Sequence, residues 1–101
     1  NKNMKEKEII TNLLIDLKSI EPDYEKFKGN PIPAKAERLI KFINIMTPHA
    51  HLFDDNFKMA IKEYILTYEA ALKGEAKGIN IVNIIESTDL LITSTLERKL
   101  Q

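Results

Sequence analysis

The residues that could do chemistry gather in one short stretch, TPHAHLFDD, at positions 47–55. It contains both histidines of the chain, His49 and His51, and the carboxylates of Asp54 and Asp55 follow closely. Imidazole and carboxylate groups are the side chains that hold zinc or exchange protons near neutral pH. A zinc or acid/base site is therefore the first hypothesis that these residue types suggest.

The spacing of these groups favours a connection between two helices instead. A zinc site needs three or four convergent ligands, and residues two positions apart do not share a helix face. The helical zinc pattern of two histidines four apart with a glutamate is absent. In the connection, Pro48 ends one helix, and Leu52 or Phe53 packs onto the core. Asp54 or Asp55 caps the next helix. We predict this connection and no metal site.

Three other groups of polar residues also have structural explanations. Tyr64 and Tyr68 lie one helical turn apart, and such pairs usually face the core with their polar tips at its rim. Residues 87–89 (Ser-Thr-Asp) offer a nucleophile and an acid, but no histidine lies near them in sequence, so local capping explains them better. Gly74 and Gly78 lack the Lys-Ser/Thr ending of a phosphate loop. We expect no catalytic residues and no enzymatic activity.

Composition limits the class of protein and its partners. A chain of 101 residues that is 44% hydrophobic and 30% charged is typical of a soluble globular protein with a single domain, residues 1–101. Its 15 basic and 15 acidic residues cancel, so no net field attracts a polyanion, and we expect no nucleic-acid partner. Nothing in the composition calls for a cofactor.

Sequence features also indicate a compartment. Cysteine is absent, which excludes disulfides and fits a reducing cytosol. No apolar run approaches the roughly 18 residues that a membrane span requires, and the basic residues near the start lead into no signal-peptide core. We therefore expect a cytoplasmic protein without stable membrane insertion. Position 1 is not a methionine, and Met4 is a candidate natural start.

The elements that position these residues are predicted by helical periodicity, and the first helix covers residues 4–19. Pro22 stops it, because the residue before a proline is pushed out of the helical region. Residues 21–32 form a linker, in which Tyr24 and Phe27 make one turn that covers the core. The apolar residues of this helix that follow the i, i+3, i+4, i+7 template are Ile10, Leu13, Leu14 and Leu17.

Two further helices follow. The second covers residues 33–46, since proline is favoured in a first turn, and Pro48 ends it. The third begins at Asp54 or Asp55 and ends at the glycines of residues 74–78. The predicted core faces are Ala36, Leu39, Ile40, Ile43 and Met46 or Thr47 in the second, and Phe57, Ala60, Ile61, Tyr64, Ile65, Tyr68 and Leu72 in the third.

The last segment, residues 79–100, begins with INIVNII, a β-branched run that taken alone is compatible with a strand. No second strand exists for it to pair with, and its core candidates keep a helical period, so we predict a helix with a kink or internal cap at residues 87–89. Those candidates are Ile81, Ile84, Ile85, Thr88, Ile92, Thr95 and Leu96. Four amphipathic helices with short connections predict an all-α fold, an antiparallel up-down four-helix bundle.

Two stretches resemble the class II bacteriocin immunity proteins of the enterocin A immunity type. KEKEIITNLLIDL, residues 5–17, is similar to the lysine-rich start and apolar first helix of that family. PIPAKAERLIKFINIMTPHAHLFDDNFKMAIKEYI, residues 31–65, is similar to its central region, with a Pro-x-Pro opening, an Arg-Leu helix and a polar loop. Together they cover about half the chain. The chain departs from the family at residues 21–32, where family members often continue with a long second helix.

The resemblance implies a function. Proteins of this family protect a bacteriocin producer against its own peptide. They act on the cytosolic side of the membrane receptor, a sugar phosphotransferase permease with bound bacteriocin. Their C-terminal half is associated with recognising the bacteriocin, which points here to the last helix. The partner-binding residues that this implies are Leu90, Leu91, Leu96, Arg98, Lys99 and Leu100. In the alternative, the leucines bury against neighbouring helices.

Two other function classes remain open. One is a generic protein-protein interaction module, antitoxin-like or adaptor-like, which would form a homodimer through an exposed apolar face. The other is a metal-binding protein or enzyme that uses His49 and His51, which predicts stoichiometric uptake of zinc.

Overall fold

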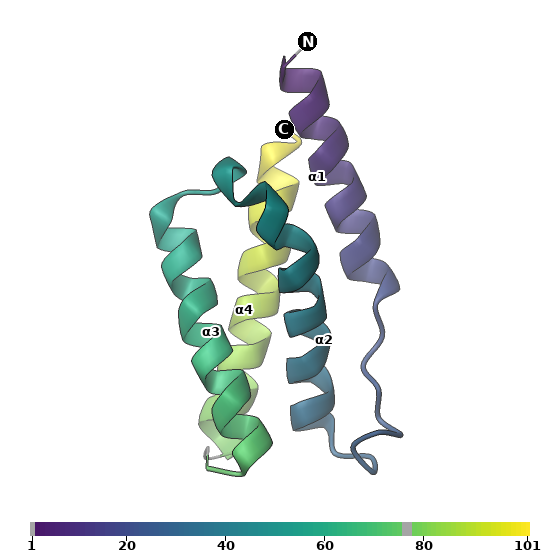
Figure 1. Cartoon of the computed structure of the whole chain (residues 1–101), viewed down its shortest axis with the longest axis vertical. Coiled ribbons are helices and arrows are strands. Elements are labelled where there is room, and N and C mark those ends of the chain that lie inside the picture. Colours follow the sequence, from purple (N-terminus) through teal and green to yellow (C-terminus); the bar gives the residue numbers. More distant parts are fainter. Residues whose placement is uncertain (1, 76–77) are drawn as a thin grey trace.

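The computed structural model describes residues 2–75 and 78–101 and contains four α-helices that run alternately up and down (Figure 1). The elements are α1 (Lys2–Ser19), α2 (Pro31–Met46), the 3₁₀ segment η1 (Thr47–Leu52), α3 (Asp55–Lys73) and α4 (Gly78–Lys99). No strand occurs among the described residues. The predicted all-α, antiparallel four-helix bundle is confirmed.

The core lies between all four helices. α4 packs against α1, α2 and α3, and α2 packs against both α1 and α3. The buried apolar residues that form one cluster include Ile10, Leu13, Leu14 and Leu17 of α1, Leu39, Phe42, Ile43 and Met46 of α2, Phe57, Ile61 and Tyr64 of α3, and Ile81, Ile85, Ile92 and Leu96 of α4. The helical stripes read from the sequence therefore describe most of this core.

Phe42 and Leu72 depart from the predicted stripes. Phe42 is fully buried although the predicted face of its helix omitted it. α2 touches α1, α3 and α4, so its buried arc is wider than one stripe. Leu72, expected in the core, is 47% exposed in the last turn of α3.

α2 begins two residues earlier than the predicted Pro33. The Asn30 side chain accepts a hydrogen bond from the Ile32 amide at 3.1 Å and caps the helix, which starts at Pro31. A proline at the first position costs nothing there, because its missing N–H would have no intrahelical partner. Pro33 still lies in the first turn, as expected.

The connection between α2 and α3 is a 3₁₀ segment rather than an open loop. Pro48 lies near the start of η1, where proline is tolerated, so the chain keeps turning to Leu52. Phe53 is then extended and only 6% exposed, and Leu52 packs partly against the same core. The prediction that one of these residues would pack onto the core is confirmed for both.

α3 begins with the predicted aspartate cap. The Asp54 carboxylate accepts a hydrogen bond from the Phe57 amide at 2.8 Å, and Asp55 is the first helical residue. At the other end, Gly74 closes the helix in the left-handed conformation with φ 71°. Glycine adopts this conformation without the Cβ clash that other residues suffer.

Replacing Asp54 with alanine is expected to lower the free energy of unfolding by about 1 kcal/mol, because the first turn of α3 loses the acceptor for one of its free amides. Urea unfolding followed by circular dichroism measures the loss. Asp55→Ala is the matched control, since it removes a carboxylate without removing a cap. Equal losses in the two variants would show that charge at the helix start, not the hydrogen bond, is responsible.

The linker forms turns but does not cover the core as predicted. Lys28 and Gly29 both have positive φ, 54° and 84°, and the Gly29 amide donates to the Tyr24 carbonyl at 2.7 Å. Tyr24 is 43% exposed, and Phe27 is half-buried with the Lys26 ammonium 5.3 Å from its ring. That ammonium also pairs with Glu37 of α2, which ties the turn to the bundle.

One arginine joins three helices where α1 ends. The Arg38 guanidinium of α2 donates to the carbonyls of Leu17 and Ile20, both at 2.6 Å. It also donates to the Asp89 carboxylate of α4 at 3.3 Å. Because the last carbonyls of a helix lack intrahelical partners, Arg38 serves as a C-terminal cap from a neighbouring helix.

α4 is one uninterrupted helix, so the predicted kink or internal cap at residues 87–89 is wrong. Thr88 is 7% exposed and faces the core. The Asp89 carboxylate accepts hydrogen bonds from Arg38 and from the Thr93 hydroxyl, at 3.3 Å each. Asp89 therefore links α4 to α2 instead of capping a helix end at this point. No helix in the described part of the chain combines the length and apolar content that crossing a membrane requires.

Candidate functional site

A hollow of about 660 Å³ opens where η1 and the start of α3 meet the end of α4. We call it the α3/α4 pocket. Its apolar lining includes Phe53, Phe57, Ala60 and Leu91, and its polar lining includes His51, Asp54, Thr95, Arg98 and Lys99. In Figure 1 this is the end of the bundle at which η1 crosses in front of α4.

Two stacked phenylalanines form the floor of this pocket. The rings of Phe53 and Phe57 lie 4.7 Å apart at 21°, and each residue is only 6% exposed. Phe53 precedes the Asp54 cap, and Phe57 supplies the amide that the cap binds. The sequence FDDNF therefore builds both the start of α3 and the aromatic floor beside it.

Basic groups lie at the rim. The Lys99 ammonium is 5.4 Å from the centre of the Phe53 ring, a cation–π contact, and the Arg98 guanidinium donates to the Thr95 hydroxyl at 3.4 Å. Within the described part of the chain, neither Arg98 nor Lys99 forms an ion pair. Asp54 is the acidic residue of the lining, and its carboxylate already caps α3. These two cations are therefore available to a bound partner.

The structure separates the residues that the resemblance had grouped as partner-binding. Leu91, Arg98 and Lys99 line the α3/α4 pocket, and Leu90 is 69% exposed on α4. Leu100 is partly buried against the core.

Leu96 has no exposed surface and belongs to the core, so it cannot contact a partner of the folded protein. It lies one turn after Ile92, which is also fully buried, on the side of α4 that the other helices cover. For Leu96 the alternative of burial against neighbouring helices therefore holds, and we remove it from the candidate site.

Sequence reasoning missed that Phe53 and Phe57 would face this pocket as well as the core, and that Ala60, which was expected in the core, would line the pocket instead. A signal for it was present, because in an antiparallel pair of consecutive helices the start of the first lies beside the end of the second. Applied to the last two predicted helices, this rule brings residues 53–60 close to residues 91–99.

Tyr64 does not present its hydroxyl to a ligand. The side chain is fully buried, and its hydroxyl donates to the Ala36 carbonyl of α2 at 2.8 Å. Burial, with a smaller contribution from the charge of Asp89, raises the pKa of the Tyr64 phenol well above its usual value. The predicted core position is confirmed, but the polar tip lies inside the bundle rather than at its rim.

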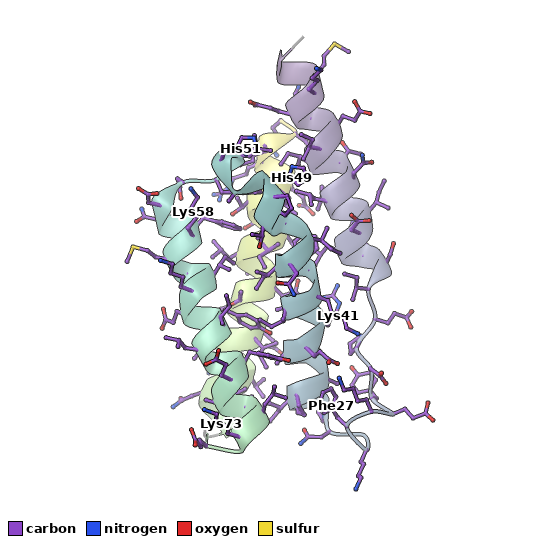
Figure 2. All side chains as sticks on the ribbon, in the orientation of Figure 1. Phe27, Lys41, His49, His51, Lys58 and Lys73 are labelled. Carbon is purple, nitrogen blue, oxygen red and sulfur yellow. The ribbon has the colours of Figure 1, made fainter. Side chains whose placement is uncertain are left out.

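The two histidines lie on η1 (Figure 2), His51 exposed at the pocket and His49 half-buried outside its lining. No group of three histidine, aspartate or glutamate side chains that could hold a metal ion occurs in the described residues.

We expect calorimetric titration with zinc to give no stoichiometric heat, because two histidines without further ligands do not complete a zinc site. The variant with His49→Ala and His51→Ala should give the same trace as the unchanged protein. Uptake of one equivalent of zinc that disappears in the double variant would contradict this prediction and favour a metal-binding function.

Comparison with known proteins identifies no relative, since no protein-family model, curated protein or solved structure matches the chain.

Proposed function

We propose that this protein is a bacteriocin immunity protein that acts by binding rather than catalysis. It acts in the cytoplasm and protects the producing cell against the bacteriocin. There it engages the cytosolic side of a sugar phosphotransferase permease with bound bacteriocin. Residues 5–17 and 31–65 resemble the enterocin A immunity type, and an antiparallel four-helix bundle is the fold that this resemblance implied.

The α3/α4 pocket is the observation that supports this proposal best. Three of the residues implied by the resemblance, Leu91, Arg98 and Lys99, lie together there with an aromatic floor. Protein-binding surfaces commonly combine buried apolar or aromatic anchors with charged groups at the rim. This pocket offers both in one place, at the C-terminal end of α4, where the resemblance places recognition.

The proposal is tested by expressing the protein in a sensitive lactic acid bacterium and challenging the cells with a panel of class II bacteriocins. We expect survival with at least one peptide. The variant Arg98→Glu with Lys99→Glu should lose protection, because it reverses both free charges of the pocket. Lys41→Glu with Lys62→Glu is the matched control, as it makes the same charge change at exposed positions outside the pocket.

Equal killing with and without the protein, for every peptide and at verified expression, would contradict the immunity function. Protection that both double variants lose equally would point to net charge instead of this pocket.

A generic interaction module is the second candidate, favoured by two exposed apolar residues on α3. Met59 and Leu66 are 67% and 66% exposed, and their spacing of seven puts them on one helix face. A homodimer through this face would appear in sedimentation at micromolar concentration and would be lost in Leu66→Glu. A monomer at all concentrations would remove this form of the second candidate.

A further inference from the structure

The α3/α4 pocket continues along the bundle as a groove. A second hollow of about 260 Å³ lies between the middle parts of α3 and α4. Both hollows are lined by Ala60 and Leu91, so they adjoin each other, and we call the two together the α3/α4 groove. Along α4 it extends from Asn83 to Lys99, roughly 24 Å at the rise of an α-helix. That length accommodates a helix of about four turns.

The shape of the groove suits a helix. The lining of the second hollow includes three small side chains, Ala60 of α3 and Ser87 and Thr88 of α4, beside the larger Tyr64, Ile84 and Leu91. Small side chains let a docked helix approach to an ordinary packing distance. Met59 and Leu90 directly precede the lining residues Ala60 and Leu91, and they are 67% and 69% exposed. A helix seated in the groove would therefore find apolar floor beneath it and exposed apolar side chains beside it.

Charge differs between the two ends of the groove. Arg98 and Lys99, which form no ion pair within the described residues, lie at one end together with His51. Glu63 lies in the other part of the groove. Asp54 is also at the basic end, but its carboxylate caps α3. A helix with an acidic last turn would complement Arg98 and Lys99 in one direction only, which sets its orientation.

We propose that the α3/α4 groove docks an amphipathic α-helix of a partner protein, with its apolar stripe over Ala60 and Leu91 and its acidic end at Arg98 and Lys99. This inference rests on the proposed function for the premise that the protein acts by binding, and it adds the chemistry of the partner segment.

The test is an NMR titration of ¹⁵N-labelled protein with two synthetic helical peptides of about 16 residues. Both carry the same leucine stripe, and they differ only in the last turn, which has two aspartates in one and two lysines in the other. We expect the acidic peptide to shift amide signals of α3 and α4 along the groove and to bind about tenfold more tightly than the basic one. In Arg98→Glu with Lys99→Glu, this preference should reverse.

Ala60→Arg supplies the steric test, because it fills the centre of the groove without removing a core residue. Binding of the acidic peptide should weaken at least about tenfold, whereas Ala70→Arg, on the same helix but outside both hollows, should leave it unchanged. Circular dichroism of both variants checks that they fold.

The proposal would be overturned by shifts confined to another face, by equal affinity for the two peptides, or by binding that Ala60→Arg leaves unaffected. A dimer of the protein alone that Ala60→Arg abolishes would assign the groove to a second copy, and would also overturn it. Groove binding without cellular protection would refute the immunity function but support the groove. Protection that survives Ala60→Arg would place immunity on another surface.

Discussion

Replacing Tyr64 with alanine is expected to lower the free energy of unfolding by about 3–5 kcal/mol, the range found for large aromatic residues removed from protein cores. The side chain is fully buried between α3 and α2, so the variant leaves a cavity that the surrounding helices fill only in part. Domains of this size are stable by only about 5–15 kcal/mol. Urea unfolding at neutral pH, followed by circular dichroism at the helix band, measures the loss.

Tyr64→Phe separates the ring from the hydroxyl. It keeps the packing and removes only the hydrogen bond to the Ala36 carbonyl, so the expected loss is about 0.5–1.5 kcal/mol. Similar losses in the two variants would assign the stability to the hydroxyl. A loss below about 1 kcal/mol in Tyr64→Ala would contradict the core position of the ring.

The same hydroxyl gives a prediction for alkaline pH. Burial raises the pKa of Tyr64 in the folded protein, whereas in the unfolded chain it titrates near the usual value of about 10. Stability from this residue is therefore complete below about pH 10 and is lost as the pH rises toward the higher folded-state pKa, because the unfolded state releases its proton first. Unfolding free energies measured from pH 8 to 11 should fall less steeply in Tyr64→Phe. Parallel curves would contradict a raised pKa.

Periodicity predicted the helices because each of them buries apolar residues that recur at helical spacing. The β-branched run at the start of α4 shows why the pattern outweighed local propensity, since Ile81 and Ile85 are both buried at helical spacing. Intrinsic preferences of this kind amount to less than about 1 kcal/mol per residue, whereas each buried isoleucine contributes roughly 1.5–3 kcal/mol. Burial of these side chains in the bundle therefore outweighs the strand preference of the β-branched residues.

Periodicity does not say which neighbour covers a face, and the candidate site depends on that. Leu90, Leu91 and Leu96 are the same residue type on one helix, yet Leu90 is 69% exposed, Leu91 lines the pocket and Leu96 is fully buried. The difference arises because α1, α2 and α3 surround one side of α4. The resemblance points to this end of the helix, but only tertiary packing distinguishes the surface residues from the core.

Long-range polar contacts could not be predicted from the sequence for a related reason. Arg38 binds groups that lie 18, 21 and 51 positions away in the chain. No local pattern links such distant positions, and an arginine beside a leucine in an amphipathic helix is usually a solvated residue. The Arg38 side chain is instead only 16% exposed. Its removal, like that of Tyr64, is therefore expected to lower stability strongly.

Replacing Arg38 with methionine is expected to lower the free energy of unfolding by about 2–4 kcal/mol. Methionine keeps much of the apolar stem but leaves the Leu17 and Ile20 carbonyls without the donor that α2 supplies. Hydrogen bonds from a charged donor contribute about 1.5–3 kcal/mol, and a buried carbonyl left unpaired costs about 1–3 kcal/mol. Urea unfolding measures the total, and loss of amide-exchange protection in the last turn of α1 would locate it.

Asp89→Asn distinguishes this cap from the ion pair that Arg38 also forms. The Asp89 side chain is 45% exposed, and exposed ion pairs contribute only about 0–1 kcal/mol because solvent screens them. The expected loss is therefore small, and Arg38→Met should remain strongly destabilising in the Asp89→Asn background. The ion pair would be the main contribution to stability if both single variants lowered the free energy of unfolding equally and the double variant lowered it no further. Arg38→Lys sharpens the test, because one ammonium cannot reproduce the planar fork that serves two carbonyls and a carboxylate.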